Sequence, residues 1–306
     1  MNLEDIQLTN ESTRRGIKYM LIASFCFALS GACTRIMRHD LGPIEMVFFR
    51  NCIGVVFILF SLAKRPANEE GGRLGLLIFR GVIGTLALYT FFYGVTKIGL
   101  AVSISYQQSY PIFLAVFGAF FLGEKLLLRE WAAVMVGFLG VILIFFPQIS
   151  MESISTKANI LGIGNAIMTG SAYLSIRGLR KYYDTRTIVL SFMATGIVLP
   201  VISILIGTNM DTKGFDFLFE RFVMPHGTTW LWLLLLGFSA LIGQIYLTKA
   251  FTHERTGIIA AAGYSNIVFS VLFGVILLDP IPSLITFSGI GLVILCGVLL
   301  AGKKKD

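Results

Sequence analysis

The polar residues that could bind a solute gather in one apolar stretch of the chain, residues 99–122. All six residues from Ser105 to Tyr110 carry a hydroxyl or an amide, and Pro111 follows them directly. A proline inside a helix frees a backbone carbonyl about one turn earlier, here near Gln107. Because buried polar groups need partners, we expect a broken or kinked helix that lines a cavity. The candidate binding residues in this stretch are Tyr106, Gln107, Gln108 and Tyr110.

Two arginines, Arg50 and Arg80, also lie inside apolar runs. An arginine at the centre of a membrane helix costs on the order of 2.5–3.5 kcal/mol, so such residues usually face the protein interior. Either arginine could bind an anionic group of a substrate. The alternative is a structural role, in which the side chain snorkels or bonds to helix carbonyls.

Further candidates lie in other apolar runs. A tyrosine offers a flat apolar face and one polar atom, which suits a planar or amphipathic solute, although packing or a place in an interfacial belt explains it equally well. For the polar pair at 264 and 266 the alternative role is interhelical hydrogen bonding. The weaker candidates are Tyr89, Tyr93, Tyr173 and Gln244, whereas Tyr264 and Asn266 belong to the polar segment of the second half.

No carboxylate falls at the centre of an apolar run. The nearest ones, at the ends of runs or in loops, are Glu45, Glu124, Glu130, Asp184 and Asp279. Proton coupling through an acid at the membrane midplane is therefore disfavoured, and a substrate with an anionic or zwitterionic part is favoured. No catalytic or metal-ligand spacing occurs, so we expect neither an enzyme nor a metal or cofactor site.

The elements that must position these residues follow from composition. The 306 residues are 56% hydrophobic and 14% charged, with a mean hydropathy of +0.80. These values predict an all-α integral membrane protein and exclude nucleic-acid binding despite the net charge of +8. We expect ten spans at residues 16–37, 43–63, 74–95, 99–122, 130–147, 159–178, 186–207, 229–250, 256–278 and 282–301.

The distribution of lysine and arginine predicts the orientation. With both termini in the cytoplasm, 17 of the 25 cationic residues lie on the cytoplasmic side, 6 lie outside, and Arg50 and Arg80 remain within spans. Both termini should therefore be cytoplasmic. The long connection 208–228 lies outside, where its mixture of aromatic and charged residues predicts either an interfacial segment on the outer leaflet or a plain loop.

A weak internal repeat relates the two halves of the chain at an offset of 156 residues. Phe113–Gly118 aligns with Phe269–Gly274, and by the same offset Gln108 corresponds to Tyr264. Five spans per copy would invert the second copy relative to the membrane, as in many secondary transporters. We therefore expect two five-helix repeats, 1–150 and 151–306, whose polar segments near residues 108 and 264 meet at the heart of the binding site.

At this level the chain resembles a known group. The stretch from Gly99-Leu100-Ala101 through Tyr110-Pro111 to Gly123-Glu124-Lys125 resembles the EamA-type domain of the drug/metabolite transporter superfamily, and Phe48-Phe49-Arg50 resembles that family's F-x-R site. The second copy departs from the pattern, because Leu278-Asp279-Pro280 replaces the Gly-Glu pair and Ile267 replaces the proline. The resemblance implies two copies of the domain and a substrate among amino acids, nucleosides, vitamins or sulfonium compounds.

Together these observations predict a secondary transporter, without an ATPase signature, in a bacterial-type inner membrane. It would export amino acids or related zwitterionic or anionic metabolites by alternating access. Uptake or exchange of a nucleoside-like or sulfonium metabolite such as S-adenosylmethionine is the alternative, and a membrane sensor or scaffold is a remote one. The expected partners are the lipid bilayer and a small metabolite, with the chain as a monomer or weak homodimer.

Overall fold

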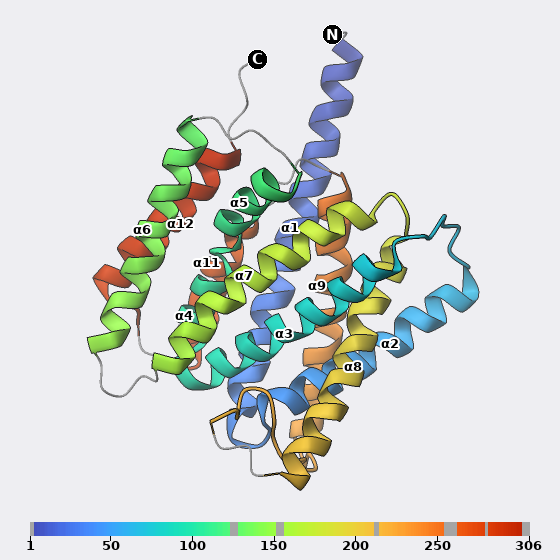
Figure 1. Ribbon diagram of the computed structural model, residues 1–306, viewed down its shortest axis with the longest axis vertical. Helices are drawn as coiled ribbons and strands as arrows, with labels where there is room; N and C mark the ends of the chain where they lie inside the picture. Colours follow the sequence, from blue (N-terminus) through green and yellow to red (C-terminus); the bar gives the residue numbers. More distant parts are fainter. Residues whose placement is uncertain are drawn as a thin grey trace.

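The fold is known from a computed structural model that describes residues 3–122, 128–150, 156–210, 214–253, 262–278 and 281–301. All regular structure in these ranges is helical (Figure 1). The helices are α1 (Leu3–Ile36), η1 (Met37–His39), α2 (Pro43–Lys64), α3 (Leu74–Ile98), α4 (Leu100–Gln107), α5 (Tyr110–Leu122), α6 (Leu128–Ser150), α7 (Thr156–Leu179), α8 (Thr185–Asn209), α9 (Thr229–His253), α11 (Ser265–Ile276) and α12 (Leu284–Ala301).

Five of these helices are long and apolar enough to cross a membrane. They confirm the expectation of an all-α membrane protein. The five spans are Arg14–His39, Pro43–Lys64, Leu74–Ile98, Thr185–Asn209 and Thr229–Phe251. The first of them, Arg14–His39, agrees with the expected span at 16–37, and the same helix continues through the preceding polar residues to Leu3.

The expected interruption of the helix at 99–122 is present. α4 ends at Gln107 and α5 begins at Tyr110, so Pro111 lies in the first turn of α5, where its missing N–H costs no hydrogen bond. The chain between them turns tightly, and the Ser109 amide donates to the Tyr106 carbonyl at 3.0 Å. A second turn lies at Tyr264, immediately before α11. Residues 256–261, the first part of the expected ninth span, lie outside the described ranges.

The long helices pack in pairs drawn from the two halves of the sequence. α1 packs along α9, α3 along α7, α2 against α8, and α6 against α12. In Figure 1, α6 and α12 stand beside the main group of helices, which they contact through α4, α5 and α7. The short helices α4 and α11 contact each other between these pairs. Helix contacts between the halves are therefore much more extensive than those within either one.

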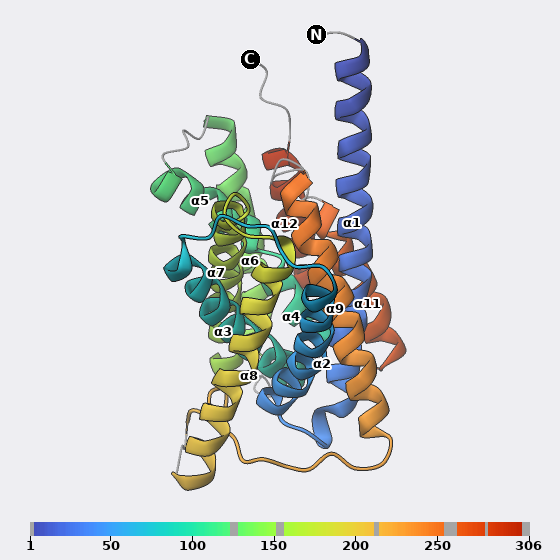
Figure 2. The same ribbon diagram turned by 90° about the vertical axis from the view of Figure 1, so that its right-hand side faces the viewer.

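The start of α1 and the end of α12 point toward the same end of the molecule (Figure 2). We call the opposite end, which holds η1, the end of α3 and segment 214–228, the distal end. Segment 214–228 runs across it from α8 to α9 without forming a helix (Figures 1 and 2). Phe215 and Phe222 are exposed on it, and its place on the outer leaflet stays a prediction.

Glycines allow the helix backbones to approach closely. A Cβ added at Gly170 of α7 would lie 3.1 Å from the Tyr110 carbonyl oxygen and 3.3 Å from the Leu114 amide nitrogen of α5. These are backbone atoms, so they can move only if the helix moves. Small residues at such contacts are how membrane helices pack without a hydrophobic driving force between them.

We expect Gly170→Val to destabilise the protein by about 1–3 kcal/mol, because the added atoms force α5 away from α7. The measurement is thermal unfolding of the detergent-solubilised protein. Gly164→Val is the matched control, because Gly164 lies on the same helix and no atom lies within 4 Å of an added Cβ there. Equal melting temperatures for the two variants would contradict this account of the α5–α7 contact.

Candidate functional site

A cavity lies among the helices where the two halves of the chain meet. The space in it that the centre of a water molecule can occupy is about 60 Å³. α1, α2, α3, α4, α7, α8, α9 and α11 all contribute side chains to its wall. Seven of the expected binding residues line it: Arg50, Arg80, Gln107, Gln108, Tyr173, Gln244 and Asn266.

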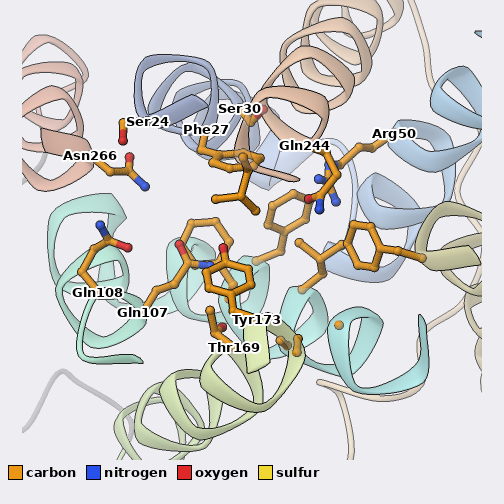
Figure 3. A pocket seen from close by; sticks show the side chains of 18 of the residues that line it. Ser24, Phe27, Ser30, Arg50, Gln107, Gln108, Thr169, Tyr173, Gln244 and Asn266 are labelled. Atoms are coloured by element: carbon orange, nitrogen blue, oxygen red, sulfur yellow. The ribbon is translucent and has the colours of Figure 1, made fainter. Parts of the chain in front are cut away.

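The side chains in the cavity divide by chemistry (Figure 3). The amides of Gln108 and Asn266 point toward each other at one side, close to Ser24. Gln244 and Arg50 lie together at the other side, and aromatic rings occupy the space between. The aromatic residues of the wall are Phe27, Phe91, Phe92, Tyr173 and Phe192. The arrangement offers two polar regions separated by an apolar, aromatic middle.

The two chain breaks meet beside the amide region. The Gln108 side-chain Nε2 donates a hydrogen bond to the Gly263 carbonyl oxygen, one residue before the turn at Tyr264. Gln108 is the residue that follows the end of α4, and Asn266 lies in the first turn of α11. The polar segments near residues 108 and 264 are thus brought together, as the sequence offset predicts.

The charged region holds two buried arginines that share one aromatic ring. Arg50 and Arg80 are each only 2% exposed. Their guanidinium carbons lie 5.7 and 4.5 Å from the centre of the Phe192 ring. This distance is that of a cation–π interaction, which is strongest where water is excluded.

The arginines are incompletely satisfied by the protein. Nε and Nη1 of Arg50 and Nε of Arg80 are buried without a hydrogen-bond partner in the part of the chain that the structure describes. Among the same described residues, no carboxylate lines the cavity. Gln244, on the same side, also has an unpartnered Nε2. Unused donors and uncompensated positive charge therefore face one small space.

Gly84 provides the room for this pair. A Cβ at that position would overlap Nη1 of Arg80 and lie 2.8 Å from the Phe192 ring. Arg80 and Gly84 are one helical turn apart on α3, so the arginine folds over the glycine toward Phe192 on α8. The position of the guanidinium thus depends on a missing side chain.

Five expected binding residues do not line the cavity. Tyr106 donates to Asn159 Oδ1 at 3.1 Å, and Tyr89 pairs with the Ser203 hydroxyl at 3.1 Å. Tyr110 and Tyr264 are buried, and their hydroxyls have no hydrogen-bond partner among the residues that the structure describes. Tyr110 packs edge-on against Tyr173, with 4.8 Å between the ring centres.

Tyr93, the fifth, lies at the distal end. Its hydroxyl donates to Asp216 Oδ2 at 3.0 Å, and Lys157 forms an ion pair with the same carboxylate. The pKa of Asp216 is lowered: burial opposes this, but the hydrogen bonds from Lys157 and Tyr93 and the positive charge of Lys157 outweigh it. Tyr93 therefore fastens segment 214–228 to α3 rather than lining the cavity.

The cavity also uses residues that the sequence analysis did not select. Ser24 and Phe27, with Met20, form one face of α1, and their helical spacing of four and three residues could have indicated it. Phe192 on α8 and Thr169 on α7 carry no such signal, because phenylalanine and threonine are common in apolar helices. Only the packing of α8 against α3 reveals what Phe192 contacts.

Comparison with known proteins agrees with this architecture. The model of the EamA-like transporter family matches residues 14–146. An uncharacterized transporter of Helicobacter pylori is 31% identical over 94% of this chain and 94% of its own length. The chain belongs to the EamA-like transporter family, within the drug/metabolite transporter superfamily. Membership indicates a transporter rather than an enzyme.

Other members of this group extend the comparison. The pseudopaline exporter of Pseudomonas aeruginosa is 30% identical over 95% of this chain and 98% of its own length. A solved crystal structure, with 17% identity, has the same fold at a TM-score of 0.64 and covers 95% of this chain and 96% of its own. These relatives establish transport of some solute across a membrane as the family's general role.

The hydroxyl of Tyr264 and the amide of Gln107 should differ in their effect on binding. Tyr264→Phe removes a buried hydroxyl that has no hydrogen-bond partner, so we expect affinity to stay within about twofold. Gln107→Ala removes a polar group from the cavity wall, and we expect affinity to fall about 5- to 10-fold. The measurement is ligand-induced thermal stabilisation over a panel of metabolites. Equal losses in both variants would contradict the placement of Tyr264 outside the cavity.

Proposed function

We propose that this protein is a secondary transporter that moves a small organic anion through the cavity between its two halves. The observation that carries the proposal is the pair Arg50 and Arg80, which are buried beside one phenylalanine ring and have donors without a partner among the described residues. A guanidinium binds carboxylate or phosphate in a fork geometry, and burial strengthens that interaction. An anionic group of the substrate would supply the missing partner.

The remaining wall suggests the rest of the substrate. The amide region at Gln107, Gln108 and Asn266 would bind a second polar group by hydrogen bonds, and the aromatic residues would cover an apolar or planar middle. An amino acid derivative or a related metabolite that has a carboxylate at one end fits this order. The candidate residues that line the cavity are proposed as its binding residues.

The net charge of the substrate distinguishes an anionic or zwitterionic cargo from the alternative substrate, S-adenosylmethionine. S-adenosylmethionine carries a sulfonium and an ammonium beside one carboxylate, so it is a net cation at neutral pH. Two buried arginines without a lining carboxylate among the described residues oppose a net cation. We therefore favour an anionic or zwitterionic cargo, and export as its direction, as in the pseudopaline exporter among the relatives.

Alternating access would follow from an inverted repeat of two five-helix halves, 1–150 and 151–306, with ten spans in all. In such a repeat α1 corresponds to α7 and α3 to α9, so the α1–α9 and α3–α7 contacts are equivalent. The α2–α8 and α6–α12 contacts each join a helix to its own counterpart, and this symmetry of the contacts supports the proposal. Because the cavity lies between the halves, rocking one against the other would open it to either side. The bias of lysine and arginine supports cytoplasmic termini in an inner membrane, with the distal end outside.

The test is transport in proteoliposomes with single neutralising variants. We expect Arg50→Gln and Arg80→Gln each to weaken binding of an anionic substrate about 10- to 100-fold, because each removes a charge-assisted interaction. Arg65→Gln is the matched control, because Arg65 is exposed in the connection after α2 and away from the cavity wall. Competition by a panel of anions, zwitterions and S-adenosylmethionine would rank the charge classes.

Two outcomes would overturn the proposal. One is unchanged affinity in both arginine variants, which would assign them a structural role only. The other is stronger competition by S-adenosylmethionine than by any anion, together with improved cation transport in the neutralised variants. A hit that binds without crossing the bilayer would instead favour a sensor.

A further inference from the structure

The distal end holds two glutamates that exchange backbone hydrogen bonds across an interface. Glu220, on segment 214–228, accepts from the amides of Ile44 and Glu45 at 3.3 and 3.4 Å. Glu45, in the first turn of α2, accepts from the Gly42 amide at 3.3 Å and from the Val223 amide. The amides in the first turn of α2 have no acceptor within the helix, and Glu220 accepts hydrogen bonds from two of them. In return, Glu45 accepts a hydrogen bond from the Val223 amide of the segment.

The fit around Glu220 is tight. A Cβ at Gly42 would overlap both carboxylate oxygens of Glu220, and one at Gly207 of α8 would overlap its backbone. The segment is therefore wedged between the start of α2 and the end of α8. A second attachment lies at Asp216, which Tyr93 and Lys157 hold against α3 and α7. The segment spans helices from both halves, so the outer end cannot open without breaking one of these attachments.

Glu220 is poised to change charge near neutral pH. Its burial raises its pKa, the long bonds from α2 oppose this only partly, and the negative charge of Glu45 adds to the rise; the pKa is about 7. An exposed glutamate has a pKa of about 4.3. The docked segment therefore binds a proton more tightly than the released one. By linkage, acid stabilises docking, and a pH above 7 weakens it.

Other charged groups surround the same hollow at the distal end. From η1 and the turn after it come Arg38, His39 and Asp40, from α3 come Tyr93 and Lys97, and the segment itself contributes Asp216 and Arg221. The described outer part of α8 contributes no titratable side chain. Histidine is the side-chain type that ordinarily changes charge between pH 5 and 8, so the experiment must remove His39.

We propose that Glu220 and Glu45 form a proton-operated latch, in which protonation of Glu220 from the outer solution holds segment 214–228 on α2 and keeps the outer end closed. Loss of that proton leaves the negative charge of the half-buried Glu220 beside that of the buried Glu45, and the segment is released. The proton is taken up from the outer solution and returned to it, so it regulates opening without being transported. The physiological meaning rests on the proposed transport function and orientation, whereas the docking equilibrium itself does not.

The test is the distance between spin labels at His39→Cys and Met224→Cys, both exposed, after the four native cysteines are replaced. Placing a label at His39 also removes the neighbouring histidine. Between pH 8 and pH 6 we expect the ratio of docked to released protein to rise about tenfold, because one proton is bound on docking and its pKa lies between these values.

Two variants should abolish the pH response, one by keeping the segment docked and the other by keeping it released. Glu220→Gln mimics the protonated side chain, so the segment should stay docked at both pH values. Gly42→Ala leaves every titratable group in place but displaces the Glu220 carboxylate, so the segment should be released at both. Glu70→Gln, an exposed carboxylate between α2 and α3, is the matched control and should respond like the parent protein.

A distance that does not change with pH in the parent protein would overturn the latch, as would an undiminished response in Glu220→Gln. Both readings come from a distance and need no transported substrate. A failed latch is therefore distinguishable from a failed transport function, which the arginine variants test separately.

Discussion

Positive charge buried without an equal negative charge is the constraint around which the centre of this molecule is organised. Arg50 and Arg80 cannot lose their protons at any physiological pH, and burying an unpaired charge is expensive. The ring face of Phe192 partly stabilises the positive charge, and the missing side chain at Gly84 leaves space for the Arg80 guanidinium to reach that ring. This compensation is partial, because donors of both arginines stay unpartnered among the described residues. A site left in this condition gains most from a ligand that brings its own negative charge.

The second organising feature is the meeting of two interrupted helices. A continuous helix uses all its backbone groups internally, whereas a break at membrane depth leaves carbonyls and amides for other partners. Here a hydrogen bond from the Gln108 side chain, at the break after α4, satisfies the Gly263 carbonyl just before α11. Because the two breaks belong to different halves of the chain, any relative movement of the halves must strain or break this bond. The polar contact next to the cavity is thereby tied to the movement that transport requires.

The sequence predicts part of this arrangement, for reasons visible in particular residues. Pro111 indicates the first break because its chemistry acts locally, and Arg50 and Arg80 stand out because charge is rare in apolar helices. The second break has Ile267 where the first has its proline, so only the weak repeat pointed to it. Tyr89, Tyr93 and Tyr106 were plausible candidates by type, yet their hydroxyls bond to other parts of the protein. Residue type cannot reveal the direction of a side chain around a helix whose neighbours are unknown.

Glu220 shows the same limit from the opposite side. It lies in a loop, where a carboxylate is ordinarily solvated and unremarkable, and its burial arises from contacts with residues about 175 positions earlier in the chain. The cavity and the distal end thus solve one physical problem with different chemistry. An arginine that is buried keeps its charge, so only a bound anion can complete its neutralisation. A glutamate that is buried can become neutral by taking a proton, so its environment converts burial into sensitivity to pH. Where a charge is only partly neutralised by the protein, an arginine therefore favours a binding site for an anion, and a glutamate favours a pH-sensitive switch.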